Sequence, residues 1–211
     1  IKKEDPKWED RDRFILSKGH AGIAYAPVLC DFGYNDPEQL KTFNLTNSKM
    51  GIHLDSNKVA GVDASTGSLG HGIPIAAGTA IAARVLGKDY YTYVVTGDGE
   101  LDEGSNWEGL MTIRHYNLTN CITIVDRNHC MIDGNTEDVM KLEPLADKFV
   151  AFGFHTIVCE GNNIVSLCKA IDEAHKTKDK PTVIVADTIK GVGIKRSEEH
   201  TSELQSRSDL V

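Results

Sequence analysis

The sequence predicts an α/β protein built on a parallel β-sheet with helices on both faces. Short apolar segments rich in β-branched and aromatic residues alternate with segments of helical pattern, which is typical of this class. The apolar segments read as continuous hydrophobic runs, as strands buried on both faces do. We expect strands at residues 90–96, 121–126, 154–159 and 182–188.

The helices are expected between these strands and before the first of them. A small, apolar segment ends at Gly33, a suitable residue for a helix C-terminus, and a second helix begins at Asp36-Pro37. The Ala-rich helix that follows ends at Gly87, and residues 105–108 form a capping-box pattern that opens another helix. The expected helices cover residues 20–32, 37 onward, 74–86, 105–116, 142–152 and 163–176.

Composition excludes several classes of function. The 211 residues carry a net charge of −8, which argues against a nucleic acid or an anionic membrane as partner. No apolar run reaches the roughly 18–20 residues that span a bilayer. Five cysteines without a Cys-x-x-Cys pair disfavour disulfides and structural zinc, so we expect a reducing, cytoplasmic location.

The two ends of the chain are treated separately. We expect residues 1–194 to form one domain that is incomplete at both termini, since the chain begins with Ile1. Residues 195–211 are polar and aperiodic, and their letters resemble the translation of a common sequencing adapter. We therefore expect them to be a non-native or disordered tail without functional residues.

Two motifs follow neighbouring expected strands and carry the chemistry. Residues 97–99 read Gly-Asp-Gly directly after one strand, and Asn128 follows the next. The carboxyl ends of parallel strands are where such sheets bind ligands. Glycines expose amides to an anion, while Asp98 and Asn128 offer the hard oxygens that Mg²⁺ prefers alongside phosphate oxygens. A plain turn and a loop residue would be the alternative, but the spacing favours a metal-diphosphate site.

The order of these motifs is that of the thiamine-diphosphate enzymes. Gly-Asp-Gly at residues 97–99, followed about thirty residues later by Asn128, resembles their shared signature. Within that group the chain resembles the transketolase family, above all the separately encoded N-terminal subunit of split transketolases. The resemblance covers nearly everything from residue 6 to residue 194. It is carried by residues 12–21, 62–70, 101–104, 131–134, 142–147 and 187–191.

The resemblance implies a role for each matching residue. Asp98, the Asn128 side chain and the backbone carbonyl of Cys130 would bind Mg²⁺ or Ca²⁺. Residues that would contact thiamine diphosphate are His20, Gly67, Leu69, Gly99 and Asn128. Catalytic roles would fall to His20, His53 and Glu103, the last in an acidic network between two cofactor sites. His53 departs from the family's Gly-His-Pro pattern, because it lies in Gly-Ile-His-Leu-Asp.

Several of these residues also have a structural interpretation. Without the family, His20 would be taken as a packing or capping residue. We interpret His71 and His129 as structural or rim residues, and the thiol of Cys130 as incidental. Asp102 is interpreted as part of an acidic first turn favoured by the helix dipole.

The implied activity is transfer of a two-carbon ketol unit from a ketose phosphate to an aldose phosphate. The resemblance further implies a homodimer or heterotetramer with a C-terminal transketolase subunit or domain, which supplies the glutamate that activates the cofactor. Dihydroxyacetone synthase, deoxyxylulose-phosphate synthase and a non-catalytic cofactor-binding or scaffold subunit are the alternatives. A doubly wound nucleotide-binding protein is disfavoured, because neither Gly-x-Gly-x-x-Gly after a strand nor a Walker lysine motif is present.

Overall fold

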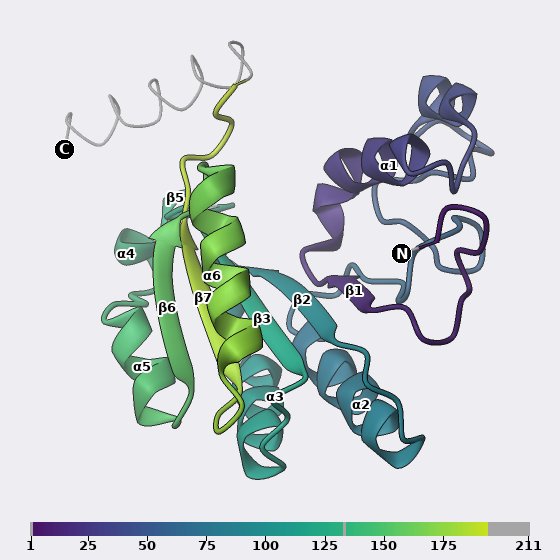
Figure 1. The fold of residues 1–211 in the computed structure, drawn as a ribbon. Coiled ribbons are helices and arrows are strands. Elements are labelled where there is room, and N and C mark those ends of the chain that lie inside the picture. Colours follow the sequence, from purple (N-terminus) through teal and green to yellow (C-terminus); the bar gives the residue numbers. More distant parts are fainter. Residues whose placement is uncertain (1, 133, 194–211) are drawn as a thin grey trace, which may run out of the picture.

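A five-stranded, fully parallel sheet forms the centre of the computed structural model, which describes residues 2–132 and 134–193 (Figure 1). The strand order is β1-β2-β3-β7-β6. The strands are β1 (Arg13–Leu16), β2 (Thr92–Gly97), β3 (Cys121–Arg127), β6 (His155–Glu160) and β7 (Thr182–Asp187). The predicted α/β class and parallel sheet are confirmed.

Helices cover both faces of this sheet, as the continuous apolar strands predict. Three helices pack on one face: α2 (Gly72–Val85), α3 (Gly104–His115) and α5 (Leu145–Ala151). Buried alanines on α2 let this helix approach the sheet closely. The opposite face carries α6 (Ile164–Lys176), which Figure 1 shows running along β7. Its N-terminus is capped by Asn163, whose side chain accepts the N–H groups of Val165 and Ser166.

The N-terminal part of the chain lies beyond β1 at the edge of the sheet (Figure 1). It contains the 3₁₀ turn η1 (Gly19–Ala21), helix α1 (Gly22–Asp31) and a 3₁₀ helix, η2 (Pro37–Thr42). These elements pack around their own apolar cluster, which includes Met50 and Leu54. An apolar groove of about 420 Å³ separates α1 from the neighbouring sheet face, and its lining does not include Asp98 or Asn128.

The helix predicted over residues 142–152 is too long at its start. Helix α5 begins only at Leu145, because Pro144 keeps the preceding residue out of the helical region. Leu142 instead donates its N–H to the Glu137 carboxylate, 3.1 Å away. The segment before α5 therefore makes a hydrogen bond with Glu137 instead of a helical turn, and its apolar sequence pattern does not predict this contact.

The predicted capping box at residues 105–108 is also wrong. Helix α3 begins at Gly104, and its N-cap Glu103 makes no side-chain capping bond. Ser105 donates its hydroxyl to the carbonyl of Gly70, at 2.9 Å. The Ser105 hydroxyl thus bonds to the loop at Gly70 and not to the first turn of its own helix.

Five short elements were not predicted as such, and four of them lie near the expected site. One is β1, and the others follow β2 and β3 at their carboxyl ends. They are η3 (Gly99–Asp102), the antiparallel pair β4 (Cys130–Met131) and β5 (Gly134–Asn135), and α4 (Thr136–Val139). Elements of two to four residues are too short for an apolar period to mark them.

Two features from the sequence lie outside the described residues. They are the expected tail at 195–211 and residue 133 of the 131–134 motif. Among the helices of the described residues, none is both long enough and apolar enough to cross a bilayer.

Candidate functional site

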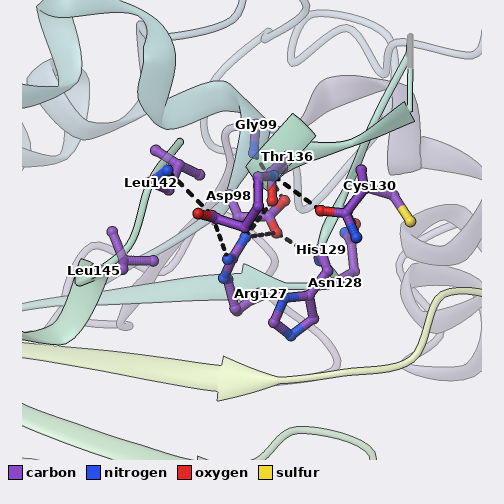
Figure 2. A network of polar contacts seen from close by, with 12 residues as sticks. Asp98, Gly99, Arg127, Asn128, His129, Cys130, Thr136, Leu142 and Leu145 are labelled. Atoms are coloured by element: carbon purple, nitrogen blue, oxygen red, sulfur yellow. Dashed lines mark hydrogen bonds and ion pairs between the residues drawn. The ribbon is translucent and has the colours of Figure 1, made fainter. Parts of the chain in front are cut away.

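The three expected metal ligands meet at the carboxyl ends of β2 and β3. Gly97 lies opposite Asp126 in the parallel register, so that the segments leaving both strands start side by side. His129 donates its N–H to Asp98 Oδ2 at 2.7 Å, which joins the two segments. Asp98, Asn128 and Cys130 thus share one corner of the molecule (Figure 2).

The two carboxylate oxygens of Asp98 have different neighbours. Oδ2 accepts from the Arg127 guanidinium at 2.9 Å as well as from His129. Oδ1 accepts the N–H of Gly99 at 2.8 Å. The Gly99 amide, which the resemblance assigns to the diphosphate, is therefore engaged by Asp98 in this conformation, and a phosphate oxygen would have to share or take over that hydrogen.

The Asn128 amide is held in one orientation. Its Nδ2 donates to Asp126 Oδ2 at 3.2 Å, and its Oδ1 accepts the N–H of Cys130 at 3.0 Å. Asp126 is in turn paired with Lys18 at 2.5 Å. Burial alone would raise the pKa of Asp126, but Lys18 and the hydroxyl of Thr188 lower it, so this carboxylate stays ionised. The oxygen of Asn128 is thereby kept away from Asp126 and on the side of Cys130.

A second group of expected residues lies around the loop of residues 65–70. A Cβ placed on Gly67 would meet the His53 ring at 3.2 Å, so this imidazole lies against the glycine. A Cβ on Gly19 would lie 2.8 Å from Thr66, which brings the chain before His20 onto the same loop. His20 and His53 are exposed, and Leu69 is half-buried. The structure therefore gathers His20, His53, Gly67 and Leu69 around one loop.

The His20 imidazole is biased toward its neutral form. Although the side chain reaches the surface, neighbouring atoms shield the ring partly from water and lower its pKa, and the nearby charge of Lys18 lowers it further. A neutral imidazole can accept a proton on one nitrogen while donating from the other. At neutral pH, His20 is thus suited to handle protons.

Glu100 joins the two groups, and sequence reasoning assigned it no role. Its buried carboxylate accepts four donors: the hydroxyls of Ser17 and Thr96 and the N–H groups of Gly70 and Gly97. One side chain therefore ties together the end of β1, the 65–70 loop and the end of β2. The donors come from distant parts of the chain, so no local pattern marks this glutamate.

Glu103 lies against the same loop. Gly70 has a φ of +87°, and a Cβ there would approach the Glu103 Cβ to 2.6 Å, so this position needs glycine. The Glu103 side chain is exposed. Asp102 is exposed and ends η3, before α3 begins at Gly104, so it lies outside the first turn of that helix. Partial burial and then the charge of Asp98 raise its pKa.

Comparison with known proteins identifies the family of the chain. The model of the family described as "Transketolase, thiamine diphosphate binding domain" matches residues 1–206. The chain belongs to the transketolase family. The resemblance inferred from the sequence is thereby confirmed.

Relatives of two sizes match the chain. A subunit of the apulose-4-phosphate transketolase of Actinobacillus succinogenes is 43% identical over 185 residues, covering 88% of this chain and 67% of the relative. The 6-deoxy-6-sulfo-D-fructose transketolase subunit SqwG of a Clostridium species is 39% identical, covering 94% and 72%. The solved transketolase of Leishmania mexicana superposes with a TM-score of 0.85 at 38% identity, over 89% of this chain and 30% of that one. The chain thus spans about two thirds of the transketolase subunits and under a third of the full-length enzyme.

The corner around Asp98 offers oxygen atoms of the kind that Mg²⁺ prefers. Asp98, Asn128 and Cys130 offer a carboxylate, an amide oxygen and a carbonyl, all hard ligands. A Cβ on Gly99 would come within 2.9 Å of the Met131 Cβ, so the glycine backbone runs close to the β4–β5 hairpin. Residues 2–132 and 134–193 hold no group of three His, Cys, Asp or Glu side chains suited to a metal. The three expected metal ligands include only one such side chain, Asp98, since Asn128 would bind through its amide oxygen and Cys130 through its backbone carbonyl.

The remaining histidines lie at the edge of this region. His129 has a φ of +60°, and its ring pairs with Asp187 at 2.8 Å. His71 is exposed and precedes the first turn of α2. Both positions are compatible with the structural or rim role expected for them.

Substitution of Lys18 by Met is expected to raise the pKa of His20 toward its ordinary value, because it removes the positive charge that disfavours imidazolium. Titration of the His20 ring protons by NMR measures this shift. Since protonation of a group with a lowered folded-state pKa opposes folding, the wild-type chain should also lose some stability as the pH falls below about 6.5. Lys18→Met should lose less.

Lys88→Met is the matched control for this titration. Lys88 pairs with Asp10 at 2.5 Å and is not among the groups that shift His20. The pKa of His20 should stay unchanged in this variant. An equal His20 pKa in Lys18→Met and wild type would show that Lys18 does not contribute to the shift.

Proposed function

We propose that the chain is the cofactor-binding subunit, or domain, of a transketolase that transfers a two-carbon ketol unit from a ketose phosphate to an aldose phosphate. The meeting of Asp98, Asn128 and Cys130 at one corner, tied through Glu100 to the loop at Gly67 and Gly70, supports it most directly. The relatives named as subunits act on different sugars, so the donor is proposed only as a class.

In this proposal Mg²⁺ is held by Asp98, the Asn128 oxygen and the Cys130 carbonyl. The Gly99 amide would donate to the diphosphate, and His20 would be a further contact of this group. Gly67 and Leu69 would contact the aminopyrimidine ring. Thiamine diphosphate supplies the carbanion chemistry, while the protein supplies orientation and electrostatics.

Proton handling falls to the two histidines beside the 65–70 loop. His20 is biased toward the neutral form and accepts a proton from a hydroxyl of the bound sugar. His53, resting against Gly67, donates a hydrogen bond near the sugar carbonyl oxygen. Such donors stabilise the negative charge that develops on an oxygen during carbon–carbon bond cleavage.

A partner completes the active site. Relatives that are themselves single subunits of a transketolase imply a second, C-terminal subunit, and we propose that it contributes the glutamate that activates the aminopyrimidine. The assembly is a homodimer or heterotetramer, in which exposed Glu103 belongs to the acidic network between two cofactor sites. We place this assembly in the cytoplasm.

Calorimetric titration of thiamine diphosphate with Mg²⁺ tests this function, with and without the C-terminal transketolase subunit from the same source. We expect tight, metal-dependent binding with the partner present and ketol transfer between sugar phosphates in the same mixture. Binding without transfer would favour a non-catalytic cofactor-binding subunit. Absence of binding in both mixtures would overturn the proposal.

A further inference from the structure

Arg127, the last residue of β3, lies behind the expected metal ligand Asp98. Its side chain is 3% exposed and that of Asp98 is 1% exposed, so the ion pair is almost completely shielded from water. Figure 2 shows the guanidinium beside Asp98, next to Thr136 of α4. Sequence reasoning assigned Arg127 no role.

All five N–H groups of this guanidinium have an acceptor. Nη1 donates to Asp98 Oδ2 at 2.9 Å and to the Thr136 hydroxyl at 2.6 Å. Nη2 donates to Glu137 and Glu143, both at 2.9 Å, and Nε donates to Glu143 at 3.2 Å. Because a guanidinium has five donors in a fixed planar fork, this set of contacts leaves it a single orientation.

The orientation of Arg127 decides how Asp98 can bind a cation. Arg127 and the His129 N–H both point at Oδ2, whereas Oδ1 takes part in neither contact. Rotation of the carboxylate to offer both oxygens to one ion would break these two hydrogen bonds and the one from the Gly99 N–H to Oδ1, and buried donors left without an acceptor destabilise the site. Asp98 is thus restricted to binding through one oxygen.

The charges around Arg127 match a divalent cation. Asp98, Glu137 and Glu143 surround the single guanidinium, so the cluster has two more negative charges than positive ones. This excess favours a cation at Asp98, while water screens the part carried by Glu137 and Glu143, which are 32% and 53% exposed. Arg127 therefore reduces the repulsion among the three carboxylates, and the cluster still keeps a net negative charge that attracts a metal ion.

We propose that Arg127 is a positioning residue that makes Asp98 a one-oxygen ligand and thereby favours Mg²⁺ over Ca²⁺ at this site. Mg²⁺ demands a near-ideal octahedron, whereas Ca²⁺ accepts carboxylates through one or two oxygens in a flexible shell. A carboxylate locked to one oxygen suits the smaller ion. This inference rests on the proposed metal site.

The test measures the dissociation constants of Mg²⁺ and Ca²⁺ separately, by calorimetry at saturating thiamine diphosphate, on the full chain with its C-terminal partner subunit. Arg127→Met should weaken Mg²⁺ binding by at least about tenfold, as loss of an outer-shell partner commonly does. Ca²⁺ binding should weaken less, because the freed carboxylate can bind it through both oxygens. The ratio of the two constants should therefore shift toward Ca²⁺.

Three variants serve as comparisons. Arg84→Met removes an exposed arginine that donates to the Tyr116 carbonyl at 2.6 Å, and it should leave both constants unchanged. Arg127→Lys should not restore the Mg²⁺ preference, since an ammonium has three donors and no fork. Glu143→Gln loosens the guanidinium without removing it, and should shift the ratio in the same direction by a smaller factor.

Thermal unfolding followed by circular dichroism shows which variants fold. If Arg127→Met does not fold, the Mg²⁺ to Ca²⁺ ratio of Glu143→Gln decides whether Arg127 sets the metal preference. An unchanged Mg²⁺ to Ca²⁺ ratio in the folded variants, alongside normal metal-dependent binding by wild type, would overturn the role of Arg127. Absence of metal-dependent binding in wild type would instead overturn the proposed function, and this inference with it.

Discussion

Replacement of Asp98 by Asn is expected to weaken metal-dependent binding of thiamine diphosphate by more than about 100-fold, because loss of a charged ligand should exceed the 10–100-fold cost of losing an outer-shell partner. Arg127 and the His129 N–H both donate to Oδ2, so the amide oxygen of the introduced asparagine will take that place. Its NH₂ group must then occupy the position of Oδ1. There it points a hydrogen at the metal site and at the Gly99 N–H, where an acceptor is needed.

Asn is a sharper test than Ala at this position. From the sequence alone, Asp98→Ala is expected to leave the fold intact. The structure argues otherwise, because Ala would leave buried Arg127 without its carboxylate partner and the His129 N–H without an acceptor. Breaking a buried ion pair costs about 3–5 kcal/mol. Asn also removes the charge of this pair, but it keeps an oxygen that can accept from Arg127 and His129, so we expect it to disturb folding less than Ala does.

Calorimetry with Mg²⁺ measures the affinity, and thermal unfolding checks that the variant is folded. Asp172→Asn, an exposed change on α6, is the matched control and should bind as wild type does. Equal affinity of Asp98→Asn and wild type would remove Asp98 from the metal site. Weak binding in a chain that melts like wild type would support the assignment.

The sequence predicted the long elements well because their patterns are strong. The strands at 92–97, 121–127 and 182–187 are continuous apolar runs, and Asn163 marks the start of α6 as a capping residue should. Strand β1 is different. It has four residues and lies inside a segment noticed for its resemblance to the family, so its pattern was too short to identify it.

The candidate site was predicted to the extent that strand order determines it. Residues at the ends of adjacent parallel strands must lie close together, and Asp98 and Asn128 do. The residues that hold them were missed for a physical reason. Glu100 is bound by Ser17 and Gly70, which are 83 and 30 positions away, so only the tertiary structure brings donor and acceptor together.

Arg127 offered a weak signal of its own. It continues the alternation of Thr123 and Val125, which are buried in β3, and a charged residue at such a position needs partners. Those partners lie in α4 and in the segment before α5, where the helix prediction was wrong. A correct start for α5 would have left Glu143 in a loop, free to meet Arg127.

Glu100→Gln is expected to lower the free energy of unfolding by about 2–6 kcal/mol, since each buried donor left without an acceptor costs about 1–3 kcal/mol. The carboxylate accepts two donors on each oxygen: Ser17 and Gly70 on one, Thr96 and Gly97 on the other. An amide has a single acceptor oxygen. Whichever way it turns, its NH₂ group faces two donors in a buried space.

Thermal unfolding measures this loss, and the melting temperature should fall by roughly 5–20 °C for a chain of this size. Glu108→Gln is the matched control, because Glu108 is exposed on α3 and its replacement removes the same charge. The melting temperature of this control should stay close to that of wild type, as surface changes usually leave stability nearly unaltered. Equal melting temperatures for the two variants would show that Glu100 does not hold the loops together. A selective loss would show that one buried carboxylate stabilises the junction of β1, the 65–70 loop and the end of the strand that precedes Asp98.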